Sequence, residues 1–460
     1  MTGSAMTSAI ASHAWLPDGW HAQVLLEWDR QGRLSKVQPN ADATGHERID
    51  GIVIPGMPNL HSHAFQRAMA GLTEYRANPA DSFWSWRQLM YRCAQKLTPD
   101  ALQAIALQLY IEMLKAGYTS VCEFHYLHHD RDGKPYADPG EHAKCLIAAA
   151  QEAGIGLTLL PVLYQYSGFG ARPALPQQQR FVSSPEWILK LLQTLRGSHP
   201  PHAGLAYGAA PHSLRAVSPD SLRELLAGLD ARAPLHIHIA EQQQEVDDCL
   251  ATLGARPVQW LLAHQAVDAR WCLVHATHMT PQETLAAARS GAVAGICPTT
   301  EANLGDGLFD AAPYLEAGGR WGIGSDSHAS VCLREELRLF EYGQRLLHQR
   351  RNVLADAAGG SVGAHLLRSA LAGGAQATGR NVAGLAVGQQ ADLLVLDAGH
   401  VNLCDRQGDA WLDSLVFANH GRSPIRDIMT AGRWVVRAGR HAQEVSAAVA
   451  YRAALSSLID

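Results

Sequence analysis

The chain has 460 residues, and its 38 Lys and Arg against 43 Asp and Glu give a formal net charge of −5. That length predicts two or three domains, or one large barrel with an accessory domain. Hydrophobic residues at 47% and charged residues at 18% exclude a disordered chain, and the slight excess of acidic residues argues against a nucleic-acid or anionic-membrane partner.

The first and last segments of the chain have the pattern of a small β domain. Up to about residue 54, short alternating runs are separated by turn signals. From about residue 386, strand-like runs return at 391–397 and 433–437. We therefore expect residues 1–54 and 386–460 to form one composite β-sandwich domain.

Between these ends, residues 55–385 alternate short apolar runs with longer stretches of helical period. Eight runs have the length and composition of buried strands, at 51–60, 119–126, 156–164, 205–212, 234–241, 271–278, 292–301 and 321–328. The helical stretches at 99–115, 219–229 and 281–289 each have Ser or Thr directly before Pro, which is typical of a helix N-cap. This alternation predicts an α/β fold, a catalytic (β/α)8 TIM-like barrel over 55–385.

The N-terminal segment, the apolar runs and the Cys residues favour a cytoplasmic enzyme. Residues 1–20 have no charge before Asp18 and no sustained apolar core, so we expect no secretory signal. No window approaches the roughly 18 consecutive apolar residues of a membrane helix. The eight Cys residues are scattered without a CxxC pair, which predicts reduced thiols and argues against a Cys-based zinc site. The Trp-rich segments are compatible with a homodimer.

The sharpest local feature is the pair His61 and His63 at the end of the first predicted barrel strand. Alternate residues of a strand point to the same face, so two imidazoles can converge on one ion there. Such a pair is weak evidence alone, because a chain with 23 His residues contains chance pairs.

Further candidate ligands fall near the ends of three other predicted strands, namely His236, His238, His275, His278 and Asp326. If the barrel closes, these strand ends meet at one mouth. A purely structural role for all of these residues would then need an unrelated explanation on each of four strands, so a shared metal site is favoured. Neutral imidazoles with one carboxylate suit Zn²⁺, or another borderline divalent ion, with an open position for water. None of the six Lys residues lies at a predicted strand end, so we expect one metal ion per chain rather than a lysine-bridged pair.

Several strings along the chain are similar to motifs of the amidohydrolase superfamily. They are PGMPNLHSHAFQRAMAGLTE (55–74), WSWR (84–87), EFHY (123–126), APHSLR (210–215), HIAEQ (238–242), CPTTEANLGDG (297–307) and SDSH (325–328). Together they resemble the mononuclear deaminase branch, and the first string resembles the deiminases that act on N-formimino-L-glutamate. The resemblance spans essentially the whole chain and implies a barrel with a β-sandwich built from both termini.

The resemblance also implies a metal centre and a hydrolytic reaction. It implies His61, His63, His238 and Asp326 as ligands, whereas His236 is expected deeper in the barrel as a structural residue. Metal-bound hydroxide would attack the formimino carbon, Asp326 would accept a proton, and Glu241 would deliver one to the departing ammonia. His275 would hold the attacking water or stabilise the tetrahedral intermediate. The step needs no organic cofactor.

The same resemblance assigns substrate binding to Gln66, Arg87, Tyr126, His212 and Arg215. N-Formimino-L-glutamate is a small dicarboxylate, and Arg215, just beyond the fourth predicted strand, can clamp one carboxylate with two hydrogen bonds. A surface or interface position for Arg87 is the alternative, because it lies in an aromatic stretch. For Glu241 the alternative is a helix-start carboxylate stabilised by the helix dipole.

Three other functions remain open from the sequence. A deaminase of the same branch acting on a purine or related ring would share the metal set, but would need stacking aromatic residues in place of two arginines. A non-catalytic metal-binding barrel would need neither Glu241 nor His275. A hydantoinase-like amide hydrolase is disfavoured because no Lys lies at a predicted strand end.

Overall fold

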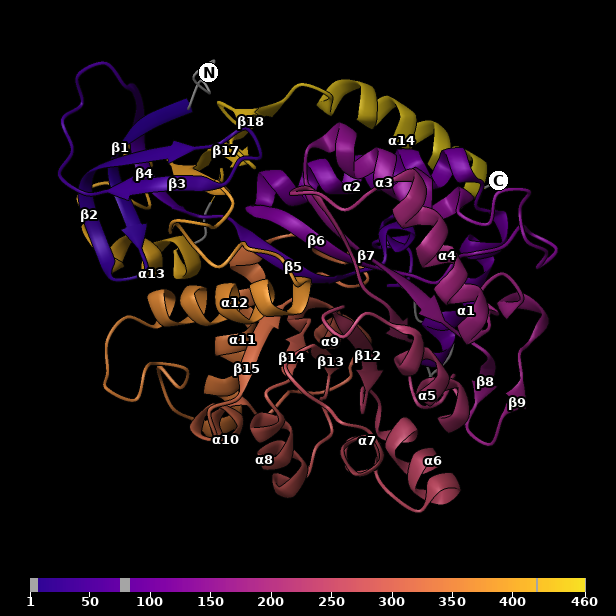
Figure 1. The fold of residues 1–460 in the computed structure, drawn as a ribbon. Coiled ribbons are helices and arrows are strands. Elements are labelled where there is room, and N and C mark those ends of the chain that lie inside the picture. Colours follow the sequence, from indigo (N-terminus) through magenta and orange to yellow (C-terminus); the bar gives the residue numbers. More distant parts are fainter. Residues whose placement is uncertain (1–6, 75–82, 419–420, 460) are drawn as a thin grey trace.

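The computed structural model describes residues 7–74, 83–418 and 421–459, and of 83–85 and 459 only the backbone. At its centre, eight parallel strands form the wall of a barrel, and helices surround it (Figure 1). The barrel strands are β5 (Met57–Ser62), β6 (Tyr118–His125), β7 (Gly156–Leu163), β10 (Leu205–Tyr207) continued by β11 (Ala210–Pro211), β12 (Leu235–Ile239), β13 (Trp271–His275), β14 (Val293–Ile296) and β15 (Arg320–Ile323). The predicted (β/α)8 architecture is confirmed.

Parallel bridges at two places close the barrel. Strands β5, β6, β7, β10 and β11 pair in one sheet, and β12 to β15 pair in a second sheet. Ser62 at the end of β5 pairs with Asp326 beyond β15, and Ala209 pairs with Leu235 at the start of β12. The carboxyl ends of all eight strands therefore face one mouth, where the side chains of a (β/α)8 active site gather.

The fourth barrel strand differs from the continuous run expected at 205–212. It is interrupted between β10 and β11, where the chain passes close to the start of β12. A Cβ atom on Gly208 would lie 2.4 Å from the carbonyl oxygen of Pro234, so only glycine allows this approach.

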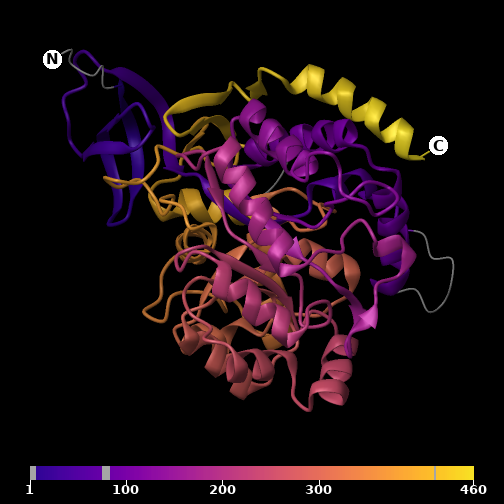
Figure 2. The same ribbon diagram turned by 45° about the vertical axis from the view of Figure 1, so that its right-hand side comes forward.

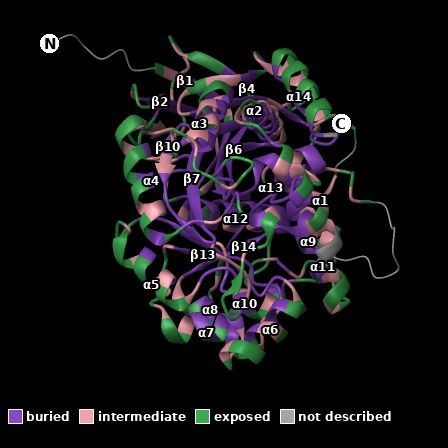
Figure 3. Cartoon of the chain, turned by 90° about the vertical axis from the view of Figure 1, so that its right-hand side faces the viewer, coloured by how far each residue is buried: buried purple, intermediate pink, exposed green. Residues whose placement is uncertain are grey.

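Helices cover the outside of the barrel, and Figure 3 shows buried strands enclosed by helices with exposed outer faces. They are α1 (Phe83–Lys96), α2 (Pro99–Ala116), α3 (Glu141–Ala153), α4 (Pro185–Ser198), α5 (Pro219–Gly228), α6 (Gln243–Leu253), α7 (Pro257–His264), α8 (Pro281–Ser290), α9 (Pro298–Leu304), α10 (Ala311–Glu316), α11 (Leu333–His348) and α12 (Val362–Thr378), with short 3-10 helices at Ala64–Met69 and Pro176–Gln178. Thr98, Ser218 and Thr280 cap α2, α5 and α8 with their hydroxyl oxygens, as the Ser/Thr–Pro signals predicted.

Strands from both ends of the chain pair in one eight-stranded sheet beside the barrel (Figure 2). Its strands are β1 (Thr7–Leu16), β2 (Gly19–Trp28), β3 (Leu34–Gln38), β4 (Glu47–Pro55), β16 (Leu393–Leu396), β17 (Ile425–Thr430), β18 (Arg433–Arg437) and β19 (Arg440–His441), and a separate hairpin joins β8 (Tyr166–Gly168) to β9 (Arg172–Pro173). The antiparallel pairing of β4 with β16 joins the two ends, and the sheet has its own hydrophobic core. The expected association of the termini is confirmed, while the boundaries at 54 and 386 stay predictions.

The last two helices are α13 (Asp409–Phe417) and α14 (Glu444–Ile459). Helix α14 leaves the terminal sheet and lies along α2 (Figure 1), where Glu444 accepts a 2.8 Å ion-pair hydrogen bond from Lys115. None of the helices in the described part of the chain combines the length and the apolar run that crossing a bilayer requires.

Candidate active site

Four side chains from three strand ends converge at the mouth of the barrel. His61 and His63 come from the end of β5, His238 from β12, and Asp326 from the segment after β15. The Nε2 atom of His61 lies 3.1 Å from that of His63 and 3.0 Å from that of His238. One Asp326 carboxylate oxygen lies 3.4 Å from His61 Nε2 and 3.2 Å from His63 Nε2. All four are buried, and their ligand atoms lie within 4.8 Å of one another.

In His63 and His238, a hydrogen bond to a backbone carbonyl determines which ring nitrogen is left to bind a metal ion. His63 Nδ1 donates to the Phe124 carbonyl at 3.0 Å, and His238 Nδ1 donates to the His212 carbonyl at 3.2 Å. Because a carbonyl oxygen only accepts, the Nε2 atoms retain their lone pairs and direct them at the same point. Burial lowers the pKa of His61 to about 3 and that of His238 well below its usual range, so both rings are neutral. Lone pairs this close repel unless a cation lies among them, so the donor set fits a divalent metal ion.

His275 and Glu241 lie beside these ligands. His275 Nε2 is 3.7 Å from Asp326 Oδ2 and 3.9 Å from Glu241 Oε1. Burial alone would lower the pKa of His275, but the carboxylates of Glu241, Asp326 and Glu301 surround the ring and raise it to about 10. His275 can therefore donate a proton or a hydrogen bond toward the centre of the site.

The backbone at these strand ends adopts left-handed conformations. His275 has φ +67°, Asp326 has φ +45°, and Ala240, between His238 and Glu241, has φ +50°. Such values are uncommon for residues other than glycine and are maintained only where the surrounding structure imposes them. They aim the side chains of separate strands at one point.

The other two histidines among the strand-end candidates have structural positions. His236 Nε2 bonds to the Ala377 carbonyl at 2.9 Å inside the barrel, so the expectation that it lies deeper is confirmed. His278 Nε2 bonds to the Asp306 carbonyl at 2.8 Å, and His278 is not among the converging ligands.

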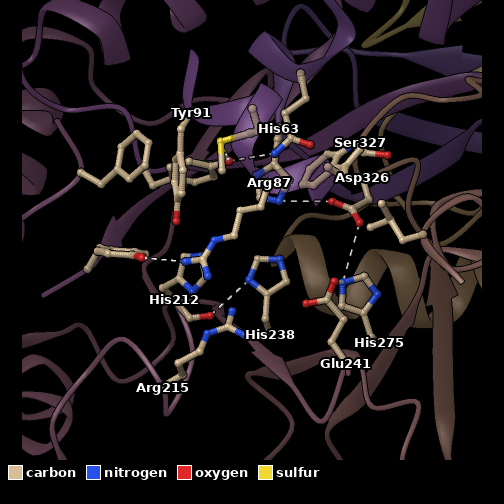
Figure 4. Close-up of a pocket in the computed structure, with 17 residues that line it drawn as sticks. His63, Arg87, Tyr91, His212, Arg215, His238, Glu241, His275, Asp326 and Ser327 are labelled. Atoms are coloured by element: carbon tan, nitrogen blue, oxygen red, sulfur yellow. Dashed lines mark hydrogen bonds and ion pairs between the residues drawn. The ribbon is translucent and has the colours of Figure 1, made fainter. Parts of the chain in front are cut away.

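The ligand cluster opens into a cavity at the mouth of the barrel (Figure 4). All five predicted substrate-binding residues line it, namely Gln66, Arg87, Tyr126, His212 and Arg215. Arg87 and Arg215 extend into the cavity from opposite sides of His212 and face the region occupied by His238 and Glu241 (Figure 4). The alternative of a surface position for Arg87 is therefore wrong: the residue is part-buried and lies on helix α1.

The fold agrees with comparisons to known proteins. Residues 52–435 match the amidohydrolase family. The chain belongs to the amidohydrolase family. Two similar proteins cover nearly all of it: the formimidoylglutamate deiminase of Pseudomonas aeruginosa is 55% identical over 455 residues, which are 99% of this chain and 100% of that protein. A crystal structure of an amidohydrolase from Brucella melitensis has a TM-score of 0.93 at 48% identity, covering 99% of this chain and 100% of that one.

More distant amidohydrolase-like structures share the fold alone. An adenosine deaminase from Xanthomonas campestris with bound zinc has a TM-score of 0.81 at 20% identity, covering 98% of each chain. Membership of the family, together with the three converging histidines and one aspartate, makes this amidohydrolase a metal-dependent hydrolase of C–N bonds.

The structure adds carboxylates to which the sequence assigned no role. Glu301, on α9, accepts hydrogen bonds from His275 Nδ1 at 3.2 Å and from the Cys297 amide at 2.8 Å. Glu123, on β6, accepts from the Ser62 hydroxyl at 2.7 Å and from the Ala64 amide at 2.6 Å, and so supports the backbone on both sides of His63. Both residues lie inside strings that resemble the family, CPTTEANLGDG and EFHY, which was the available signal. The side chains of Trp84 and Ser85 in the WSWR string lie outside the described residues.

Proposed function

We propose that this amidohydrolase hydrolyses N-formimino-L-glutamate to N-formyl-L-glutamate and ammonia, with one Zn²⁺ per chain. The observation that carries the proposal is the presence of two guanidinium groups, Arg87 and Arg215, in the cavity that contains the metal ligands and Glu241. A substrate with two carboxylates accounts for both arginines, since a guanidinium binds a carboxylate through paired hydrogen bonds. The relative from Pseudomonas aeruginosa, named for the same substrate, supports it.

His61, His63, His238 and Asp326 would hold the metal ion, which when bound makes a water molecule more acidic. Histidines with one carboxylate are a donor set that Zn²⁺ accepts.

The chain's own residues then have separate tasks in the hydrolysis. Water adds to the formimino carbon while Asp326 takes one of its protons and Glu241 delivers one to the imino nitrogen. The second proton of the water then also passes to this nitrogen as the C=O bond forms, so that the C–N bond breaks and ammonia leaves. His275, which carries a proton because three carboxylates surround it, stabilises negative charge that develops during the addition.

The substrate-binding residues would orient the formimino carbon toward Glu241. Arg87 and Arg215 would each bind a carboxylate, and His212 lies between these two arginines and packs against the metal ligand His238 (Figure 4). Burial and the nearby Arg215 and Arg87 hold the pKa of His212 well below its usual range, so it stays neutral beside the two cations. The reaction belongs to histidine degradation, and a small soluble substrate of this kind fits a cytoplasmic enzyme.

Deamination of a purine or related ring is the competing proposal, because Tyr91, Tyr126, Tyr164 and Phe181 also line the cavity. The test is ammonia release by the purified, metal-quantified protein given N-formimino-L-glutamate, guanine or adenosine. Release from N-formimino-L-glutamate alone, with about one metal per chain, supports the proposal. Release from a nucleobase substrate alone contradicts it, and silence on all three favours a non-catalytic metal site.

A further inference from the structure

Tyr164 directly follows β7 and lines the same cavity as Arg87, although only 2% of it is exposed. Its hydroxyl oxygen lies 3.1 Å from Arg87 Nη2 and 2.9 Å from Gln178 Nε2. Both neighbours are N–H donors that cannot accept a hydrogen bond, so the phenol oxygen accepts twice. The hydroxyl hydrogen of Tyr164 is consequently left to be donated elsewhere.

Gln178 fixes this arrangement from the short helix Pro176–Gln178. Its Oε1 accepts from the Leu175 amide at 2.8 Å, and a backbone N–H can only donate, which determines the orientation of the side-chain amide. Its Nε2 then donates to Tyr91 at 2.7 Å and to Tyr164 at 2.9 Å. Both amide hydrogens are used, and Gln178 is only 1% exposed, so it has little freedom to change partners.

No acceptor for the Tyr164 hydroxyl hydrogen lies within hydrogen-bond distance among the residues that the structure describes. A buried donor without an acceptor costs free energy, so this hydrogen needs an acceptor supplied from the cavity. The ring itself is restrained, because it packs edge-on against His212 with centroids 4.8 Å apart. A fixed O–H donor thus lies directly beside a guanidinium, and an anionic oxygen satisfies both.

We propose that Tyr164 is a substrate-binding residue whose hydroxyl donates a hydrogen bond to the carboxylate bound by Arg87, and that Gln178 is its positioning residue. The inference rests on the proposed function, because a purine carries no carboxylate. Tyr91 contributes to the same arrangement, since the Arg87 guanidinium lies 5.3 Å from the centroid of its ring. Together these contacts hold the guanidinium and the hydroxyl in place before substrate arrives, which reduces the entropy lost on binding.

The test compares Tyr164→Phe with wild type in steady-state ammonia release from N-formimino-L-glutamate. Loss of one charge-assisted hydrogen bond should raise KM about tenfold and leave kcat within about twofold. Tyr166→Phe is the matched control, because Tyr166 is a part-buried tyrosine on β8 whose hydroxyl makes no hydrogen bond in the described structure, and the KM of this variant should not change. An unchanged KM for Tyr164→Phe, or a loss confined to kcat, overturns the proposal.

Substrate analogues make the assignment more specific. Two analogues are compared, each with a different one of the two carboxylates replaced by an amide. One of these analogues lacks the carboxylate that Tyr164 contacts. With that analogue, Tyr164→Phe and wild type should have the same KM, whereas the other analogue should still show about a tenfold difference. Equal effects of the substitution on both analogues contradict a contact with one defined carboxylate.

The role of Gln178 is tested by Gln178→Met, which keeps the volume and removes both amide donors. It should raise KM in the same way, and should add little when combined with Tyr164→Phe, because both changes disturb one interaction. Effects on KM that simply multiply in the double variant would contradict positioning through Tyr164. Thermal melting of each variant identifies any general loss of folding.

A separate measurement distinguishes failure of this inference from failure of the proposed function. If wild type releases no ammonia from N-formimino-L-glutamate, the proposed function is wrong, and binding of N-formyl-L-glutamate is measured by thermal shift. Stabilisation of wild type that Tyr164→Phe reduces still supports a carboxylate contact. Absence of stabilisation in wild type, or equal stabilisation of both proteins, overturns it.

Discussion

Glu301 accepts a hydrogen bond from Nδ1 of His275 at 3.2 Å, which turns the opposite nitrogen of the ring toward Glu241 and Asp326. This contact links α9, the helix after β14, to the end of β13. It is the kind of outer contact that fixes the orientation and tautomer of a catalytic or metal-binding histidine.

Glu301→Gln should keep the hydrogen bond but remove the negative charge behind His275. We expect kcat to fall about 10- to 100-fold with the metal content unchanged, because the protonated form of His275 becomes less stable. Steady-state kinetics with metal analysis of the purified variant measures this. Glu316→Gln, at an exposed position at the end of α10, should behave as wild type. Wild-type kcat in Glu301→Gln would show that the charge behind His275 is unimportant.

Glu241→Gln should separate metal binding from proton transfer. Glutamine has the same size and is expected to leave the four ligands undisturbed, but it cannot carry the proton to the departing nitrogen. We expect about one metal per chain and a loss of at least about 100-fold in kcat. Glu224→Gln, on the exposed face of α5, provides the control. Full turnover by the Glu241 variant would remove that residue from the mechanism.

Arg215→Met should weaken substrate binding more than the chemical step. The substitution keeps an unbranched side chain of similar reach and removes the guanidinium that faces the cavity. We expect KM to rise about 10- to 100-fold, the loss of a paired hydrogen bond to a carboxylate. Arg223→Met removes an exposed arginine from α5 and should leave KM unchanged. An unchanged apparent affinity in Arg215→Met would contradict the carboxylate clamp.

Removal of the metal should destabilise the folded protein as well as abolish activity. The Nε2 atom of His61 would then lie 3.1 Å from that of His63 and 3.0 Å from that of His238 with no cation among them. We expect a chelator to lower the thermal midpoint of unfolding and added Zn²⁺ to restore this midpoint. An ion that binds only the folded state stabilises that state. A thermal midpoint that does not respond to chelator would argue against occupation of this site.

A second group of buried histidines predicts loss of stability in acid. Burial lowers the pKa of His128 to about 3, of His142 to about 4, and of His125 well below its usual value. Between these values and the ordinary histidine pKa of about 6.5, the unfolded chain binds more protons than the folded one. Folding stability should therefore be fully present above about pH 6.5 and should fall as the pH drops toward 4.

Urea midpoints of metal-free protein at pH 7.5 and 5.0 measure this loss. His142→Gln, whose amide can still donate to the Leu127 carbonyl, should show a smaller difference between the two pH values, because one proton-binding group is removed. An equal pH effect in wild type and variant would mean that His142 does not contribute.

Much of the fold could be predicted from local pattern. Apolar runs ending in polar residues located all eight barrel strands, and Ser or Thr before Pro located three helix starts, because strand alternation and helix capping depend on residues close together in the chain. The break between β10 and β11 could not be seen, since it depends on how closely Gly208 approaches Pro234, 26 residues away.

The sequence by itself determined which residue types stand at the strand ends: His61 and His63 after one strand, His238 and Glu241 near a second, and Asp326 after a third. Only the tertiary structure decided that they meet, because ring closure through the pairing of Ser62 with Asp326 joins segments 264 residues apart. It also decided the hydrogen bonds of Tyr164 with Gln178 and Arg87, which no periodicity encodes. Local spacing sets the direction of a side chain along its own strand or helix, whereas the partners of a buried hydroxyl depend on packing between elements distant in the chain.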